Sequence, residues 1–116
     1  MNRILVLGGT GFVGRALCQR LAAHSASTRI VVPTRRLPHA QDLRALPTVD
    51  VLQADVHDDK QLAAALAGCD AVVNLVAILH GSTAEFDRVH VTLPRRLAQA
   101  CQVAGVKRLI ETNCPA

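Results

Sequence analysis

A glycine-rich stretch near the start of the chain is the clearest chemical signal in the sequence. Residues 8–14 read GGTGFVG and lie between a short apolar run and a segment with helical periodicity. Glycines placed in this way allow a sharp turn, let a pyrophosphate approach the backbone, and let helix and strand pack closely. The N–H groups at the helix start, with the helix dipole, can then hold the phosphates. The residues predicted to form this site are Gly8, Thr10, Gly11, Phe12, Val13 and Gly14. The alternative is a tight turn that binds nothing.

A pair of arginines follows the second predicted strand, in the segment PTRR that contains Arg35 and Arg36. A site that prefers NAD usually carries Asp or Glu about 20 residues beyond the glycines, where the carboxylate binds the 2′-hydroxyl of the adenosine. This segment has no carboxylate, and two guanidinium groups can instead pair with a 2′-phosphate. We therefore expect NADP as the preferred cofactor, with NAD as the second choice. Two solvated loop arginines are the alternative interpretation.

Two further segments stand at the ends of predicted strands, where ligands of parallel α/β sheets bind. Asp55 and Val56 are predicted to contact the adenine edge, with the carboxylate accepting from the exocyclic amine; a loop-capping aspartate is the alternative. Asn74, inside an apolar run, is expected to bond a neighbouring backbone group. The small and apolar residues that follow it suit close approach to the adenosine ribose: Leu75, Val76 and Ala77.

The elements that must position these residues alternate between strands and helices. Predicted strands cover residues 3–7, 29–33, 49–54, 70–79 and 106–112. Predicted helices cover residues 12–24, 58–67 with Asp58 as N-cap, and 83–104, with a short helix around residues 40–46. This alternation predicts an α/β fold: a Rossmann-type parallel sheet of about five strands in the order 3-2-1-4-5, with helices on both faces.

Composition limits the class of protein. The chain has 116 residues, half of them apolar, which suits a single domain. Its net charge is +4, and the basic residues are spread along the sequence without the basic run that is typical of nucleic-acid binding. Its cysteines and histidines lack the paired spacing of a metal site, so buried reduced thiols are expected. No stretch is long enough to predict a membrane span. The expected location is the cytoplasm; the alternative is peripheral attachment to a membrane complex.

These motifs together resemble an extended or atypical short-chain dehydrogenase/reductase. Within that superfamily, residues 32–36, 46–49 and 54–58 are similar to the bacterial relatives of the NAD(P)-binding accessory subunit of respiratory complex I. The likeness covers residues 1 to about 110. It implies NADP binding without established turnover, and a neighbouring group of relatives comprises epimerases and dehydratases.

Three departures from that superfamily matter for function. His90 stands where Asn is frequent, the end of the predicted fifth strand lacks the usual Ser, and the chain contains no tyrosine. A Tyr-x-x-x-Lys pair, which the reductase mechanism of the superfamily uses, is therefore absent from this sequence. We expect a domain over residues 1–116 that is incomplete at its C-terminal end, with the side of the fifth strand covered by a protein partner or a second copy. A non-catalytic NADP-binding module, the nucleotide-binding half of a reductase or epimerase, and a redox-sensing module remain open as functions.

Overall fold

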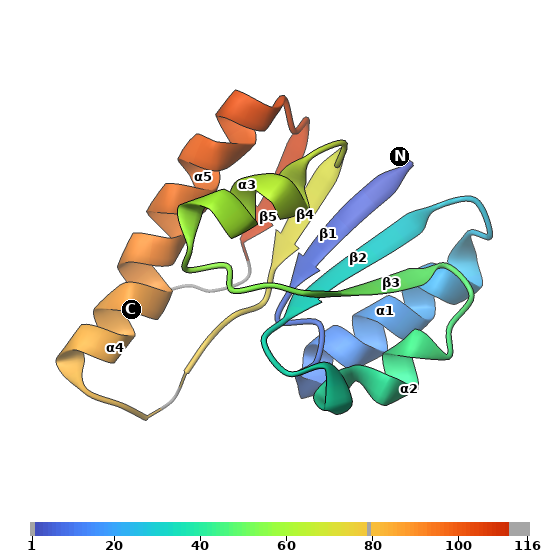
Figure 1. Cartoon of the computed structure of the whole chain (residues 1–116), viewed down its shortest axis with the longest axis horizontal. Helices are drawn as coiled ribbons and strands as arrows, with labels where there is room; N and C mark the ends of the chain where they lie inside the picture. The colour runs from blue at the N-terminus through green and yellow to red at the C-terminus, as the bar shows by residue number, and fades with distance from the viewer. Residues whose placement is uncertain (1, 79, 112–116) are drawn as a thin grey trace.

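Five parallel strands form one sheet in the order β3-β2-β1-β4-β5 (Figure 1). The computed structural model describes residues 2–78 and 80–111. The strands are β1 (Arg3–Leu7), β2 (Arg29–Thr34), β3 (Val49–Gln53), β4 (Ala71–Asn74) and β5 (Arg108–Glu111). The helices are α1 (Phe12–His24), the 3-10 helix η1 (Leu37–Ala40), α2 (Gln41–Arg44), α3 (Asp59–Leu66), α4 (Thr83–Asp87), the π-helical turn η2 (Arg88–Thr92) and α5 (Leu93–Ala104). The α/β fold class and the strand order are confirmed.

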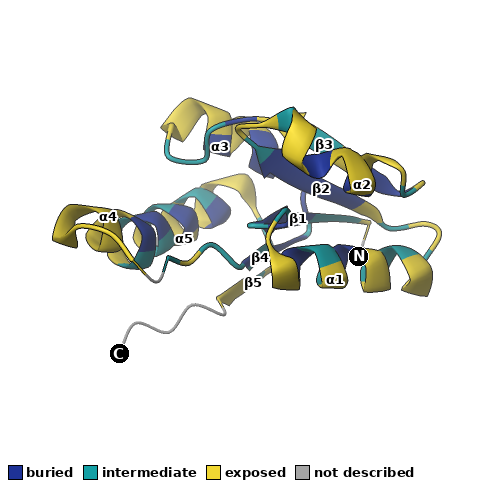
Figure 2. Ribbon diagram, turned by 90° about the horizontal axis from the view of Figure 1, so that it is seen from below, coloured by how far each residue is buried: buried dark blue, intermediate teal, exposed yellow. Residues whose placement is uncertain are grey.

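The central strand β1 feeds two hydrophobic cores, one on each face of the sheet. Leu5 and Leu7 belong to a buried cluster with side chains of α3 and α5, whereas Val6 belongs to a second cluster with side chains of α1 and α2. Successive side chains of a strand point to opposite faces, so one short apolar strand can serve both cores. Figure 2 shows the buried strands between α1 on one side and α3 on the other.

Local signals set several element boundaries. The carboxylate of Asp58 accepts hydrogen bonds from the N–H groups of Lys60 and Gln61, at 2.9 and 3.1 Å, and so caps α3. Gly105 ends α5 in the left-handed conformation, with φ at 75°. Pro33 pairs with β3 one residue before β2 ends, as expected for a residue that cannot donate to the ladder.

The fourth strand is shorter than predicted. It ends at Asn74, because its neighbour β1 ends at Leu7 and the chain there turns away at Gly8. The N–H of Leu75 donates one more hydrogen bond to the carbonyl oxygen of Leu7, at 2.9 Å, and the backbone of Leu75 and Val76 then packs directly against Gly8. β5 likewise ends at Glu111 in the described part, and the predicted strand positions 79 and 112 lie outside the described residues.

The predicted long helix contains a π-helical turn that the sequence reasoning did not anticipate. This turn, η2, precedes Pro94, which has no N–H to donate to the carbonyl of His90 four residues earlier. A local π-turn accommodates such a missing bond and allows the helix to continue. The ring of His90 contacts the backbone after β4: its Nε2 lies 3.1 Å from the carbonyl oxygen of Ile78.

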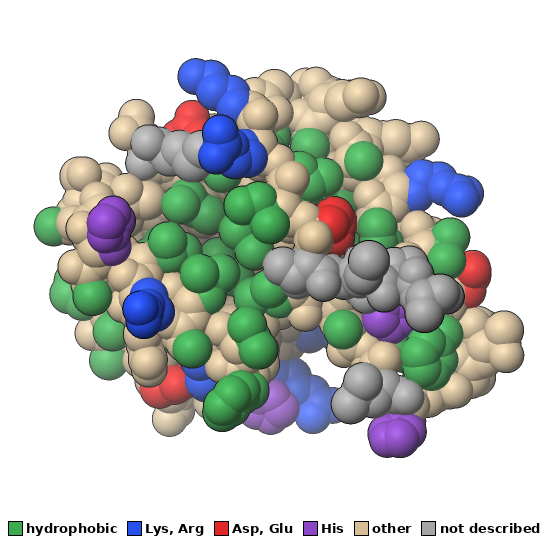
Figure 3. All heavy atoms as spheres, turned by 180° about the vertical axis from the view of Figure 1, so that it is seen from behind, with side chains coloured by type: hydrophobic (Ala, Val, Ile, Leu, Met, Phe, Trp, Pro, Cys, Tyr) green, Lys and Arg blue, Asp and Glu red, His purple; other side chains and the backbone are tan. Residues whose placement is uncertain are grey.

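The sheet is covered unevenly near β5. Val73 and Ile110 are paired in the β4–β5 register and share the face of Val6, toward α1, yet Ile110 remains 45% exposed. Figure 3 shows hydrophobic side chains gathered on the surface seen from this side of the molecule. Within residues 2–78 and 80–111, no helix covers this part of the sheet.

The described cysteines are buried thiols, as expected. Cys18, Cys69 and Cys101 are free and buried, and burial raises the pKa of the Cys18 thiol to about 11. Cys114 lies outside the described residues. A thiol of this kind is mostly protonated near neutral pH and is a poor nucleophile.

Candidate dinucleotide site

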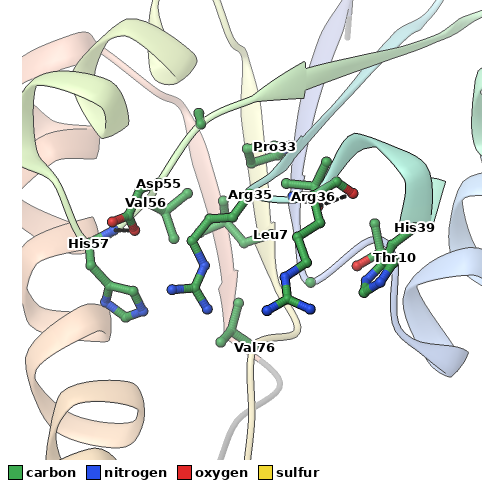
Figure 4. Close-up of a pocket in the computed structure, with 13 residues that line it drawn as sticks. Leu7, Thr10, Pro33, Arg35, Arg36, His39, Asp55, Val56, His57 and Val76 are labelled. Carbon is green, nitrogen blue, oxygen red and sulfur yellow. Dashed lines mark hydrogen bonds between the residues drawn. The ribbon is translucent and has the colours of Figure 1, made fainter.

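A cavity of about 540 Å³ opens at the carboxyl edge of the sheet, where β1, β2, β3 and β4 end side by side (Figure 4). We name two stretches beside it by their residues: the glycine turn, residues 8–11, which contributes Gly8 and Thr10 to the lining, and the arginine wall, residues 34–39. The lining residues are Leu7, Gly8, Thr10, Pro33, Thr34, Arg35, Arg36, His39, Ala54, Asp55, Val56, His57 and Val76. The carboxyl edge is where parallel α/β sheets place their ligands.

Gly8 in the glycine turn and Gly14 in α1 have no room for a side chain. A Cβ on Gly14 would lie 2.2 Å from the carbonyl oxygen of Gly8 and 2.6 Å from the Cα of Gly9. Gly8 adopts a φ of 79°, and a Cβ there would lie 2.9 Å from the carbonyl carbon of Leu75. These two glycines therefore serve the turn and the packing of helix against strand.

Gly11 is different, because space lies open around it. A Cβ built there meets one backbone oxygen, that of Gly8, at 3.4 Å, and its φ of −76° is accessible to any residue. Glycine at this position is therefore not required by the fold of the described residues. Open space beside a backbone that carries no side chain is what an approaching phosphate needs.

The N-terminus of α1 begins at this open position without a side-chain cap. Gly11 is the N-cap residue, no side chain bonds the first N–H groups, and the first turn contains no acid. Phe12 is 93% exposed and Val13 is 62% exposed, so neither side chain covers the turn. Neither residue lines the cavity itself, but both follow Thr10, which does. The helix thus presents unpaired donors and the positive end of its dipole beside the cavity.

Arg35 and Arg36 extend into the cavity from the end of β2 (Figure 4). The hydroxyl of Thr34 accepts a hydrogen bond from the backbone N–H of Arg36 at 3.2 Å, which fixes the turn. Within the described part of the chain, neither guanidinium forms an ion pair with a carboxylate. Both charges are therefore available to an anionic ligand.

Asp55 acts as a loop cap, which was the alternative interpretation of this residue. Its Oδ1 accepts a hydrogen bond from the N–H of His57 at 2.9 Å, and its own N–H donates to the side chain of Gln61 at 2.7 Å. The carboxylate still lines the cavity together with Val56. A structural role and a ligand contact are compatible here, because a carboxylate has several acceptor positions.

The segment after β4 is only partly at the cavity. Val76 lines it, Leu75 packs against the α1-side core, and Ala77 is outside the lining. Asn74 is fully buried; its Oδ1 accepts from the N–H of Val76 at 3.1 Å, and its amide donates to Glu111 at 2.9 Å. Asn74 thus bonds neighbouring groups, as expected from its apolar surroundings.

The cavity is also lined by two histidines that the sequence did not lead us to predict, His39 and His57. Burial lowers the pKa of His57, and the nearby charge of Arg88 adds to this effect, while Asp55 opposes it. Its Nδ1 is buried and has no hydrogen-bond partner among the described residues. His57 directly follows Asp55 and Val56 in the loop after β3, so its place next to two predicted site residues was the available signal.

The cavity is positively charged. Among its described lining residues, Asp55 is the single acid beside two arginines and two histidines. No group of His, Cys, Asp and Glu that could hold a metal ion is found within residues 2–78 and 80–111. In the same part of the chain, no helix has the length and apolar character of a membrane span.

Comparison with known proteins shows the family to which this chain belongs. The model of the NAD dependent epimerase/dehydratase family matches residues 4–114, so the chain belongs to that family. The expected likeness to short-chain dehydrogenases/reductases and to the complex I accessory subunit is thereby confirmed.

Among the curated relatives is mitochondrial NADH dehydrogenase (ubiquinone) 1 alpha subcomplex subunit 9 of Mus musculus, 28% identical over 93% of this chain and 29% of that protein. Another is the 3 beta-hydroxysteroid dehydrogenase/Delta 5→4-isomerase of Mycobacterium tuberculosis, 34% identical over 97% of this chain and 32% of that protein. The chain therefore spans about a third of the length of the curated relatives it matches.

Solved structures agree with the fold. Uronate dehydrogenase from Agrobacterium tumefaciens, complexed with NAD, superposes with a TM-score of 0.78 at 25% identity over 96% of this chain and 40% of that chain. A short-chain dehydrogenase/reductase superfamily protein from the same organism, with bound NAD, superposes with a TM-score of 0.75 at 28% identity over 94% of this chain and 31% of that chain.

Proposed function

We propose that the chain binds NADP, with the pyrophosphate on the glycine turn and α1, the 2′-phosphate on Arg35 and Arg36, and the adenosine beside Asp55, Val56 and Val76. The observation that carries the proposal is that an uncapped helix N-terminus lies beside the cavity into which two arginines extend, neither of which has an acidic partner among the described residues. Unpaired backbone donors and a planar guanidinium pair suit two phosphate groups at once.

The same proposal assigns binding and not turnover to this chain by itself. NADP supplies hydride transfer when bound, and a reductase of the superfamily needs in addition a phenol to exchange the proton of the substrate. The sequence contains no tyrosine. We therefore regard residues 1–116 as a dinucleotide-binding domain that spans part of its relatives' length, with a binding role like that implied by the complex I accessory subunit family.

A test of cofactor preference uses calorimetric titration of the chain with NADP and NAD. Replacing Arg35 and Arg36 together by Ala should weaken NADP about 10- to 100-fold, because charge-assisted hydrogen bonds contribute about 1.5–3 kcal/mol each, with partial compensation by water. NAD affinity should change little. Arg44→Ala is the matched control, since Arg44 is exposed on α2 and does not line the cavity. Equal weakening of both cofactors would overturn the assignment of the 2′-phosphate.

A second candidate function is the nucleotide-binding half of a reductase or epimerase, favoured by the enzymes among the relatives. Oxidation of NADPH by added quinones, or conversion of added sugar nucleotides to other sugars, distinguishes the two, because a binding module causes neither. A redox-sensing module would instead release a bound partner with NADPH but not with NADP. The exposed face at Val73 and Ile110 is where we expect such a partner, or a second copy, to pack.

A further inference from the structure

Arg15 connects the two sides of the cavity without lining it. It lies on α1, one turn after the N-cap. Its Nε donates to the carboxylate of Asp42 at 2.8 Å, and its two terminal nitrogens donate to the backbone carbonyls of Thr10 and His39. All three nitrogens of the guanidinium are thus engaged, each with a different acceptor.

The three acceptors come from both walls of the site. Thr10 belongs to the glycine turn, His39 belongs to the arginine wall, and Asp42 lies on α2, which follows that wall directly. The hydrogen bond from Arg15 lowers the pKa of Asp42, which keeps this carboxylate charged. A planar guanidinium holds three acceptors in a fixed geometry, which a flexible ammonium group does not.

The place of Arg15 runs against the usual preference of a helix. A cation near the N-terminus opposes the helix dipole, and the first turn of α1 contains no acid to offset it. Local rules that a sequence breaks without local compensation commonly point to function. The contacts of Arg15 with the two walls supply the compensation here.

We propose that Arg15 is a positioning residue, which sets the distance between the glycine turn and the arginine wall so that one dinucleotide can contact both. This inference rests on the proposed binding of NADP. Arg15 does not line the cavity, so it acts on the ligand through the two walls and not by direct contact.

The proposal predicts that the effect of Arg15 depends on how much of the site a ligand spans. NADP reaches both walls, and joining two contacts in one molecule raises affinity only when their spacing is right. Adenosine 2′-monophosphate carries the 2′-phosphate and no pyrophosphate, so it reaches the arginine wall alone. Loss of the correct spacing should weaken the first ligand and spare the second.

The experiment compares Arg15→Met with Arg20→Met, a matched change of an exposed arginine on the same helix. Affinities for NADP and for adenosine 2′-monophosphate are measured by calorimetry, well below the melting temperature of each variant. We expect Arg15→Met to bind NADP about tenfold or more weakly and adenosine 2′-monophosphate as the wild type does, with Arg20→Met unchanged for both.

Further variants separate positioning from charge and from stability. Arg15→Lys keeps the charge but not the three-way contact, so it should behave like Arg15→Met; full recovery of NADP affinity would overturn the proposal in favour of simple attraction. Equal loss for both ligands would mean a merely structural role. If Arg15→Met does not fold, Asp42→Ala removes one of the three acceptors of Arg15 and should show a smaller loss of affinity for NADP alone. A wild-type chain that binds adenosine 2′-monophosphate but not NADP would refute the proposed function itself.

Discussion

Two glycines three residues apart should respond in opposite ways to substitution. Gly11 borders open space and has an extended N-cap conformation, whereas a Cβ on Gly14 collides with the backbone of Gly8 and Gly9. We therefore compare Gly11→Asp with Gly14→Ala. The first changes the proposed phosphate site and leaves the fold intact; the second changes the packing of α1 on β1.

The expected magnitudes follow from these contacts. Asp is a better N-cap than Gly by a few tenths of a kcal/mol, and its charge at the helix N-terminus adds about 0.3–1 kcal/mol, so Gly11→Asp should be slightly more stable than the wild type. A carboxylate about 4 Å from a phosphate opposes binding by about 4 kcal/mol at an effective dielectric constant of about 20, a loss on the order of 1000-fold in affinity.

Gly14→Ala should instead lose stability. At the upper end of the usual range, overpacking lowers the free energy of unfolding by about 3 kcal/mol. The better helix propensity of Ala raises it by about 1 kcal/mol. The net loss of about 2 kcal/mol corresponds to a fall in melting temperature of about 8 °C for a domain of this size. The contact of 2.2 Å with the carbonyl oxygen of Gly8 places this substitution at the severe end, because both partners are backbone.

The assay is thermal unfolding of each variant without ligand, followed by calorimetric titration with NADP. The decisive pattern is a Gly11→Asp variant with an unchanged or raised melting temperature and no measurable binding. Wild-type affinity in that variant would refute the assignment of the pyrophosphate to α1. An undiminished melting temperature in Gly14→Ala would show that the close packing is not required.

Two titratable groups should give opposite pH dependences of stability. Burial raises the pKa of Glu111 above its ordinary 4.5, partly offset by the Asn74 amide; the folded state then binds more protons than the unfolded state, so stability falls as pH rises through that window. Glu111→Gln should therefore be more stable than the wild type at pH 7, with the difference vanishing near pH 4. For His57, burial lowers the pKa below 6.5, so stability falls as pH drops below 6.5, and His57→Gln should lose less on acidification. Urea unfolding from about pH 4 to 8 measures the free energy of unfolding of each variant and of the wild type. If the free energy of a variant changes with pH in the same way as that of the wild type, the statement about that residue is wrong.

Local signals in the sequence were sufficient to predict most of the helices and strands and the order of the strands in the sheet. Gly14, the capping Asp58 and the terminal Gly105 act within a few residues of themselves, so their structural consequences are predictable without tertiary contacts. The regular alternation of strands and helices then leaves few ways to connect a parallel sheet, since the crossovers are right-handed. The α/β fold and the order of its strands followed from these facts.

The tertiary structure decided what depends on residues distant in sequence. β4 stops at Asn74 because its partner β1 stops there, which its own apolar composition does not reveal. His39 and His57 reach the same cavity from separate loops, and Arg15 acquires its role only when the folded chain brings Thr10 and His39 within reach of one guanidinium. A sequence pattern records side-chain types and spacing, whereas these properties depend on distances that exist only after the sheet has assembled.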